Sequence, residues 1–133
     1  MCFNNVQLLG MDTGLPDVCN TPRAAGAPVP VPYPNIGVKA TAIPTALNIL
    51  NACMPIHNIL TITPLTNGDN AGVMLGVASA LVMGPSRNLM GSTCLFNQCM
   101  PQTRSFMDPT LQNSTNCPGT NLIPSQVTNI TLR

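Results

Sequence analysis

Fourteen prolines and ten glycines are spread along the 133 residues of this chain, and they constrain its fold more than any other feature. Proline removes a backbone donor and ends helices, while glycine weakens them. Few windows of about a dozen residues, the usual length of a helix, avoid both residue types. The sequence therefore predicts a mainly β fold of short strands and turns with little helix. The length suits a single domain over residues 1–133.

Proline occupies every second position of the segment Pro28–Pro34. Alternate amides of an extended chain point to opposite edges, so these prolines remove the donors from one edge only. The amides of Val29, Val31 and Tyr33 point to the other edge. The segment is therefore typical of a strand at the edge of a sheet, or else of a polyproline-like connector.

An internal repeat is the strongest pattern in the chain. Leu47–Pro55 aligns with Thr93–Pro101 at an offset of 46 residues, and each copy ends in Asn, one variable residue and Cys-Met-Pro. A strand that runs into a tight turn would explain this pattern. The first 45 or so residues hold no third Cys-Met-Pro, yet 133/3 is about 44. Two units are therefore expected, and a pseudo-threefold arrangement is suggested.

The composition excludes several classes of function. Charged residues make up 7% of the chain, with five basic and four acidic side chains. A surface that follows nucleic-acid phosphates, or a basic membrane-surface helix, needs more positive charge than this. A free monomer with so few charges would be poorly soluble. We therefore expect no nucleic-acid partner and expect a protein partner to cover much of the surface.

The N-terminal segment Met1–Asn5 has neither a basic start nor an apolar run of signal-peptide length. Synthesis in the cytoplasm without such a signal is the expectation. The longest apolar stretch, Ala71–Gly84, is shorter than the roughly 20 residues that span a bilayer, so we expect no stable membrane insertion. Within this stretch, Ala71–Met83 could form a short helix or a buried strand.

Catalysis has little support in the sequence. His57 is the only histidine, and no G-x-S-x-G nucleophile elbow or glycine-rich phosphate loop is present. A thiol enzyme that pairs a cysteine with His57 would need one unusually reactive cysteine. The expectation is that the protein is not an enzyme.

A metal site is the more plausible chemistry. Zinc prefers thiolate and imidazole ligands, and Cys19, His57 and Cys117 each lie beside turn residues that can bring distant segments together. Asp69 could be a fourth ligand. Alternatively, the cysteines are small buried residues and His57 hydrogen-bonds a carbonyl. The alternative hypothesis for the function of the whole chain is a small stand-alone zinc-binding or redox module.

An ordered series of short motifs resembles the PAAR-like branch of the spike-tip proteins of type VI secretion systems and related contractile injection machines. The name-giving Pro-Ala-Ala-Arg motif matches Pro55–Asn58 and Pro101–Arg104 in degenerate form. The resemblance covers nearly the whole chain. The matching segments are Val6–Asp12, Pro16–Pro22, Val31–Asn35, Cys53–Asn58, Thr66–Gly72, Val82–Arg87, Leu111–Gly119 and Ile123–Gln126.

This resemblance implies a small cone of short strands. Its base would cap a trimeric spike protein of the VgrG class, with one copy per trimer, and its apex would lead the spike through a target membrane. The Val29–Tyr33 strand and the two Cys-Met-Pro strands are the expected contacts with the spike. The resemblance also implies zinc near the apex, effector or adaptor proteins as further partners, and expulsion from the bacterial cytoplasm when the machine fires.

Overall fold

The computed structural model describes residues 2–131, and these residues form a mainly β structure, as predicted. The only helical element among them is the short 3-10 helix η1, Lys39–Thr41. None of their helices is long and apolar enough to cross a bilayer. The strands are β1 Cys2–Phe3, β2 Met11–Thr21, β3 Val29–Val38, β4 Ala46–Asn51, β5 Met54–Ile56, β6 Ile62–Thr63, β7 Thr66–Asn67, β8 Ser86–Asn88, β9 Phe96–Asn97, β10 Met100–Pro101, β11 Pro109–Gln112, β12 Cys117–Ile123 and β13 Ile130–Thr131.

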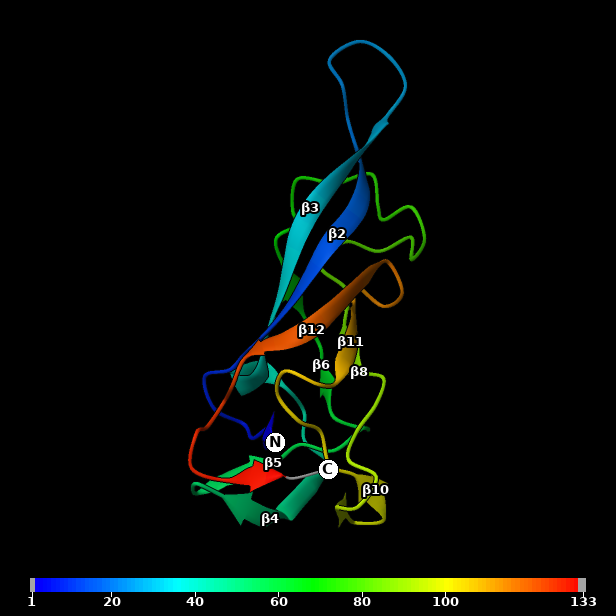
Figure 1. The fold of residues 1–133 in the computed structure, drawn as a ribbon. Coiled ribbons are helices and arrows are strands. Elements are labelled where there is room, and N and C mark those ends of the chain that lie inside the picture. Colours follow the sequence, from blue (N-terminus) through cyan, green and yellow to red (C-terminus); the bar gives the residue numbers. More distant parts are fainter. Residues whose placement is uncertain (1, 132–133) are drawn as a thin grey trace.

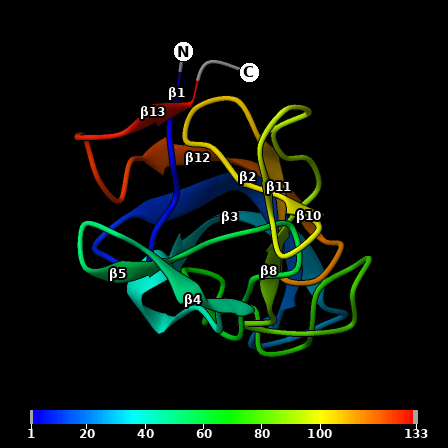
Figure 2. The ribbon, with the colours of Figure 1, turned by 90° about the horizontal axis from the view of Figure 1, so that it is seen from below.

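A seven-stranded antiparallel sheet in the order β6-β8-β11-β12-β2-β3-β7 forms the body of the molecule. The hairpin of β2 and β3 rises out of this sheet as a long arm at the narrow end (Figure 1). Three two-stranded sheets, β1-β13, β4-β5 and β9-β10, lie around the wide end, which we call the base (Figure 2). The outline is the expected small cone.

The two copies of the repeat are the two hairpins of the base. In each, the residue pair between the strands adopts the left-handed conformation: φ is 53° at Ala52 and 62° at Cys53, and 52° at Gln98 and 63° at Cys99. Two consecutive left-handed residues are typical of the type I′ turn, whose twist suits a two-residue hairpin. The predicted strand and tight turn are therefore confirmed in both copies.

A ring of three backbone hydrogen bonds closes the fold above the base. Asn5 N donates to Thr103 O (3.1 Å), Thr103 N donates to His57 O (3.2 Å), and His57 N donates to Asn5 O (2.9 Å). Thr103 and His57 are separated by the repeat offset of 46 residues. Asn5 supplies the third member from the first part of the chain, where no Cys-Met-Pro exists. The ring gives the suggested pseudo-threefold arrangement a structural basis.

Strand β3 has the one-sided pairing predicted for an edge. Residues Val29–Tyr33 pair with β2. On its other side, β3 pairs only through Ile36 and Gly37, with β7, after the prolines end. The prolines therefore face an edge that offers no amide donor to another strand. This arm lies at the narrow end and the Cys-Met-Pro hairpins at the base (Figure 1), so the two expected spike contacts do not share one surface.

The segment Ala71–Met83 is neither of the two predicted elements. It forms a series of turns with a single β-bridge, between Gly76 and Cys19. A side chain at Gly72 would approach the Cβ atom of Cys19 to 2.2 Å. Leu75 has a φ of 74°, which a helix or strand does not accommodate. Close packing against β2 therefore overrides the apolar periodicity.

The interior is unusually polar and the exterior unusually apolar. The buried apolar cluster is small and consists of Val6, Ala46 and Ile56. Most other buried side chains are amides, hydroxyls or charged groups, including the ion pairs Lys39–Asp12 (2.9 Å) and Arg104–Asp108 (2.8 Å). Large apolar side chains are exposed on the base hairpins, along the main sheet and in the turns of residues 73–81. Such a surface is typical of a protein that meets an apolar partner.

Candidate metal centre

A change of register within β2 turns two potential ligands toward the interior. Asp12 and Gly14 are buried, and the pairing with β3 shifts between Gly14 and Asp17. Beyond this bulge the buried positions become Asp17 and Cys19. A one-residue shift moves every following side chain to the opposite face of a strand. Without the bulge, this pair would face solvent.

A tight turn after β7 brings Asp69 to the same place. Gly68 has a φ of 133°, and a Cβ atom there would lie 2.1 Å from the carbonyl oxygen of Pro34. Only glycine fits this approach. The turn leaves Asp69 fully buried, where its Oδ2 atom accepts a hydrogen bond from Met83 N (2.9 Å).

Asp17, Cys19 and Asp69 form a compact group of ligand atoms. One ligand atom from each lies within 4.8 Å of the others, and all three residues are buried. The Cys19 thiol donates to Asp17 Oδ1 at 3.5 Å and to Asp69 Oδ2 at 3.9 Å. We call these three residues the DCD cluster.

Asparagine amides surround the DCD cluster. Asn113 is in the left-handed turn between β11 and β12, and its Nδ2 atom lies 2.9 Å from Asp69 Oδ2 and 3.4 Å from Asp17 Oδ1. Asn116 and Asn35 also donate through Nδ2 to the Asp17 carboxylate. Three amides therefore direct positive dipoles at the carboxylates, but an amide carries no net charge.

The donor set of the DCD cluster fits a divalent cation such as zinc. Two carboxylates are buried side by side, and in the part of the chain that the structure describes neither forms an ion pair. Asp69 Oδ1 is buried without a hydrogen-bond partner. Buried charge of this kind is costly unless a cation compensates it. Zinc accepts both thiolate sulfur and carboxylate oxygen.

Burial, followed by the negative charge of Asp17 and hydrogen bonding to it, raises the pKa of the Cys19 thiol to about 12. Cys117, at the start of β12, lies near the same carboxylates. Burial, then the charges of Asp17 and Asp69, raise its pKa to about 12. A metal ion would bind the thiolate and would therefore have to displace a proton.

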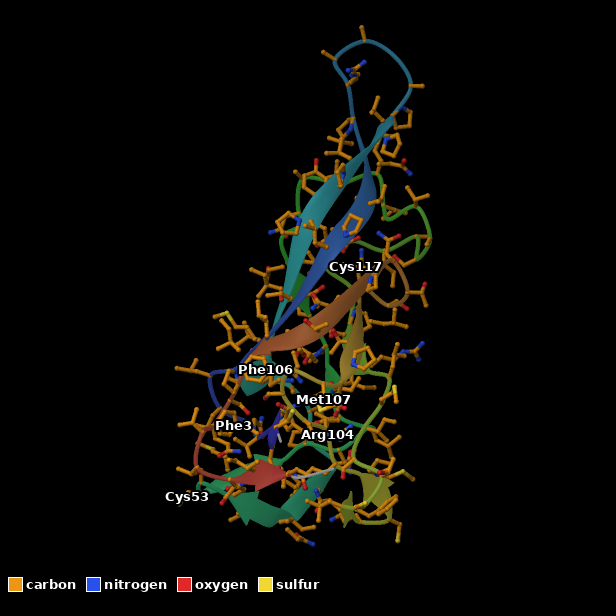
Figure 3. All side chains as sticks on the ribbon, in the orientation of Figure 1. Phe3, Cys53, Arg104, Phe106, Met107 and Cys117 are labelled. Atoms are coloured by element: carbon orange, nitrogen blue, oxygen red, sulfur yellow. The ribbon has the colours of Figure 1, made fainter. Side chains whose placement is uncertain are left out.

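His57 lies outside this group. It belongs to the ring above the base, whereas Cys117 lies higher in the cone, beneath the β2–β3 arm (Figures 1 and 3). Burial, followed by the charge of Lys39, lowers the pKa of His57 to about 3. Of the predicted ligands Cys19, His57 and Cys117, the structure brings Cys19 and Cys117 under the influence of the same carboxylates and places His57 elsewhere.

Sequence reasoning named Asp69 as a fourth ligand and missed Asp17. The available signal was the spacing of Asp17 and Cys19, because residues two apart on a strand share a face. The bulge that determines which face is buried has no comparable sequence signal.

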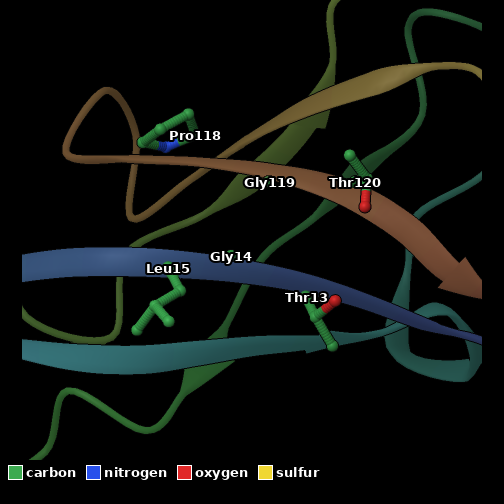
Figure 4. Close-up of a pocket in the computed structure, with 6 residues that line it drawn as sticks. All are labelled: Thr13, Gly14, Leu15, Pro118, Gly119 and Thr120. Atoms are coloured by element: carbon green, nitrogen blue, oxygen red, sulfur yellow. The ribbon is translucent and has the colours of Figure 1, made fainter.

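A shallow depression of about 370 Å³ lies between β2 and β12 (Figure 4). Its lining contains no titratable side chain, so it offers little chemistry. The residues around it are Thr13, Gly14, Leu15, Pro118, Gly119 and Thr120.

A family model matches most of the chain. The family model of the toxin PAAR-like domain matches residues 10–119, which include the whole DCD cluster. No curated protein and no solved structure matches the chain significantly.

Proposed function

Because the chain belongs to the toxin PAAR-like domain family, we propose that it is the tip of the spike of a type VI secretion or related contractile injection system. In this role one copy caps the blunt end of a trimeric, VgrG-class spike. The role is mechanical and involves no catalysis. The protein assembles in the bacterial cytoplasm and leaves the cell with the spike, and effector or adaptor proteins are its further partners.

The pseudo-threefold base is the observation that carries this proposal. A single chain that caps three identical chains must offer each of them a similar surface. The ring of Asn5, His57 and Thr103 places three segments around one axis. The three two-stranded sheets of the base then offer one ribbon to each spike chain.

The chemistry of these ribbons also suits a buried interface. Each of the three carries an exposed large apolar side chain: Leu47 and Leu50 on β4, Phe96 on β9 and Ile130 on β13. Interface centres are depleted in charge and enriched in such residues. Burial against the spike would remove this apolar area from water.

Zinc is the metal that we assign to the DCD cluster, with Asp17, Cys19 and Asp69 as ligands. The ion would neutralise the buried carboxylates and connect β2 to the turn that follows β7. Its role is to fix the upper part of a cone that has little apolar core beneath it. Cys117 lies close enough to share the electrostatic field of these carboxylates.

A stand-alone metal-binding module is the second candidate, because one chain supplies the whole DCD cluster. A thiol enzyme that uses Cys19 or Cys117 is a weaker candidate. The raised pKa of Cys19 and of Cys117 leaves almost no thiolate near neutral pH.

Native mass spectrometry of the chain co-expressed with a trimeric spike protein from the same genome tests the proposal. We expect a complex of three spike chains and one copy of this chain, with the mass of one zinc ion added. The double substitution Leu47→Asn and Leu50→Asn should reduce this complex because it makes one ribbon polar. A chain that carries zinc but never joins the spike would favour the stand-alone module.

A further inference from the structure

The segment Gly72–Met83, which we call the apolar loop, lies beside the arm in the upper part of the cone, away from the base (Figure 1). It contains five exposed large apolar side chains and no charged residue. Between 42% and 62% of the surface of each is exposed. The five are Val73, Met74, Leu75, Val77 and Leu81.

Unusually for a surface loop, most of its backbone donors are satisfied within the protein. Met74 N and Val77 N donate to carbonyl oxygens of β2, at 3.1 and 3.0 Å. Ala78 N donates to Asn116 Oδ1 at 2.8 Å. Altogether nine of the twelve backbone amides donate hydrogen bonds within the protein: those of residues 72, 74, 75, 76, 77, 78, 80, 81 and 83.

This combination suits an environment without water. A loop that enters hydrocarbon loses its hydrogen bonds to solvent, and each unsatisfied backbone group then costs several kcal/mol. The apolar loop avoids the part of this cost that its amides would bring, because nine of them already have partners. The carbonyl oxygens of residues 72, 75, 76 and 81 also accept hydrogen bonds. The outward side chains of the loop are the kind that gain from leaving water.

The charge distribution fits a lipid surface. All four aspartates are buried. Among the described residues, only Arg23 and Arg87 are exposed charged side chains. Among the described residues, no exposed carboxylate side chain would therefore repel an anionic headgroup, and Arg23, in the loop that joins β2 to β3, would attract it.

We propose that the apolar loop inserts shallowly into the hydrocarbon of a lipid bilayer. The inference rests on the proposed function, because the tip of a spike is the part that meets the target membrane, and it adds a specific contact surface. With twelve residues arranged as turns, the loop reaches the boundary between headgroups and acyl chains and does not span the bilayer.

Vesicle flotation of the full chain tests this contact. The probe is vesicles of phosphatidylglycerol and phosphatidylethanolamine, with phosphatidylcholine vesicles to measure the contribution of headgroup charge. The loop variant combines Val73→Thr, Leu75→Asn and Val77→Thr. Threonine keeps the shape of valine, and asparagine tolerates the left-handed backbone at Leu75 (φ 74°), so the variant keeps its fold.

We expect the loop variant to partition about 30-fold or more weakly than the wild type, since three partly exposed apolar side chains lose their gain from burial. The matched control is Leu47→Asn with Leu50→Asn at the base, which also removes exposed leucines. It should bind vesicles like the wild type and bind the spike more weakly than the wild type. The loop variant should bind the spike like the wild type and bind vesicles more weakly. Failure of this inference is therefore distinguishable from failure of the proposed function.

A tryptophan reporter locates the contact, because the chain has no native tryptophan. Met74→Trp should shift its emission to the blue and be quenched by brominated acyl chains, while Leu50→Trp should show neither change. Three results would overturn the inference. The first is equal quenching of the tryptophans at positions 74 and 50. The others are a loop variant that binds vesicles as well as the wild type, and a wild type that does not float with vesicles. Loss of spike binding by the loop variant would instead identify the loop as a protein interface.

Discussion

Replacing Asp69 by asparagine should have opposite effects on stability without and with zinc. In the metal-free protein, Asp69 adds a second buried carboxylate beside Asp17 without a cation. The ligand atoms lie within 4.8 Å, and two unit charges at that separation repel by about 3 kcal/mol at an effective dielectric constant of about 20. Asp69→Asn removes this repulsion and changes the shape of the side chain very little.

The hydrogen bonds of Asp69 survive the substitution. The asparagine oxygen can accept from Met83 N and Asn113 Nδ2, as Oδ2 does now. The asparagine NH2 group would take the place of Oδ1, which has no partner. We therefore expect the free energy of unfolding of the metal-free variant to rise by about 2–3 kcal/mol. In urea, this corresponds to a midpoint higher by about 1–3 M.

Zinc should reverse the order of stability of the wild type and Asp69→Asn. A ligand at 1,000 times its dissociation constant stabilises the folded state by about 4.1 kcal/mol, which exceeds the about 2–3 kcal/mol that Asp69→Asn gains without metal. The wild type should gain this stability, and Asp69→Asn should gain almost none because it lacks one of the three proposed ligands. The assay is urea unfolding in reducing buffer, with a chelator and then with a defined zinc concentration.

The matched control is Asp108→Asn, because Asp108 is a buried carboxylate with a cation partner, Arg104, at 2.8 Å. It should destabilise the protein by about 3–5 kcal/mol with or without zinc. The reasoning is refuted if metal-free Asp69→Asn is less stable than the wild type. Equal stabilisation of both proteins by zinc would exclude Asp69 as a ligand.

Three further predictions concern other parts of the fold. The pKa of His57 is lowered from 6.5 to about 3, so between these two pH values a proton binds the unfolded chain better than the folded one. The stability that neutral His57 contributes is therefore complete above pH 6.5 and is lost as the pH falls toward 3. The loss amounts to about 4–5 kcal/mol, and His57→Gln should flatten a denaturation series over this range; an unchanged slope would contradict the assignment. Pro30→Val with Pro32→Val should restore outward amides on β3 and cause self-association in light scattering, whereas a monomer at high concentration would argue against edge protection. Ala52→Asn with Cys53→Gly should stabilise the left-handed turn by about 1 kcal/mol in thermal unfolding, and a lower melting temperature would contradict the turn type.

The features that were predictable from sequence depend on local backbone chemistry. The prolines of Pro28–Pro34 lack amide hydrogens in any fold, so they indicate a protected edge wherever the strand lies. The Cys-Met-Pro repeat predicted two similar units, each with a strand that runs into a tight turn, because a tight turn imposes its own residue preferences. The offset of 46 residues also anticipated the relation between His57 and Thr103 in the ring.

The features that were not predictable depend on packing between distant segments. Asn5 completes the ring without any repeat motif, because a backbone hydrogen bond places few demands on its side chain. Asp17 becomes a candidate ligand through a bulge that changes which face of β2 is buried. The turns of Ala71–Met83 follow from contact with β2 and cancel the periodicity that suggested a helix or strand.

The ring of Asn5, His57 and Thr103 also has a consequence for how the chain folds. Its members are separated by 52 and 46 residues, and β1 pairs with β13 across almost the whole chain. Contacts of such high sequence separation form slowly, because the entropy of closing a large loop is lost before any bonds are gained. The pseudo-threefold axis therefore cannot form until the ribosome has delivered the last third of the protein. A nascent chain would expose its apolar hairpins until then, so assembly of the tip should be a late and chaperone-sensitive step in building the spike.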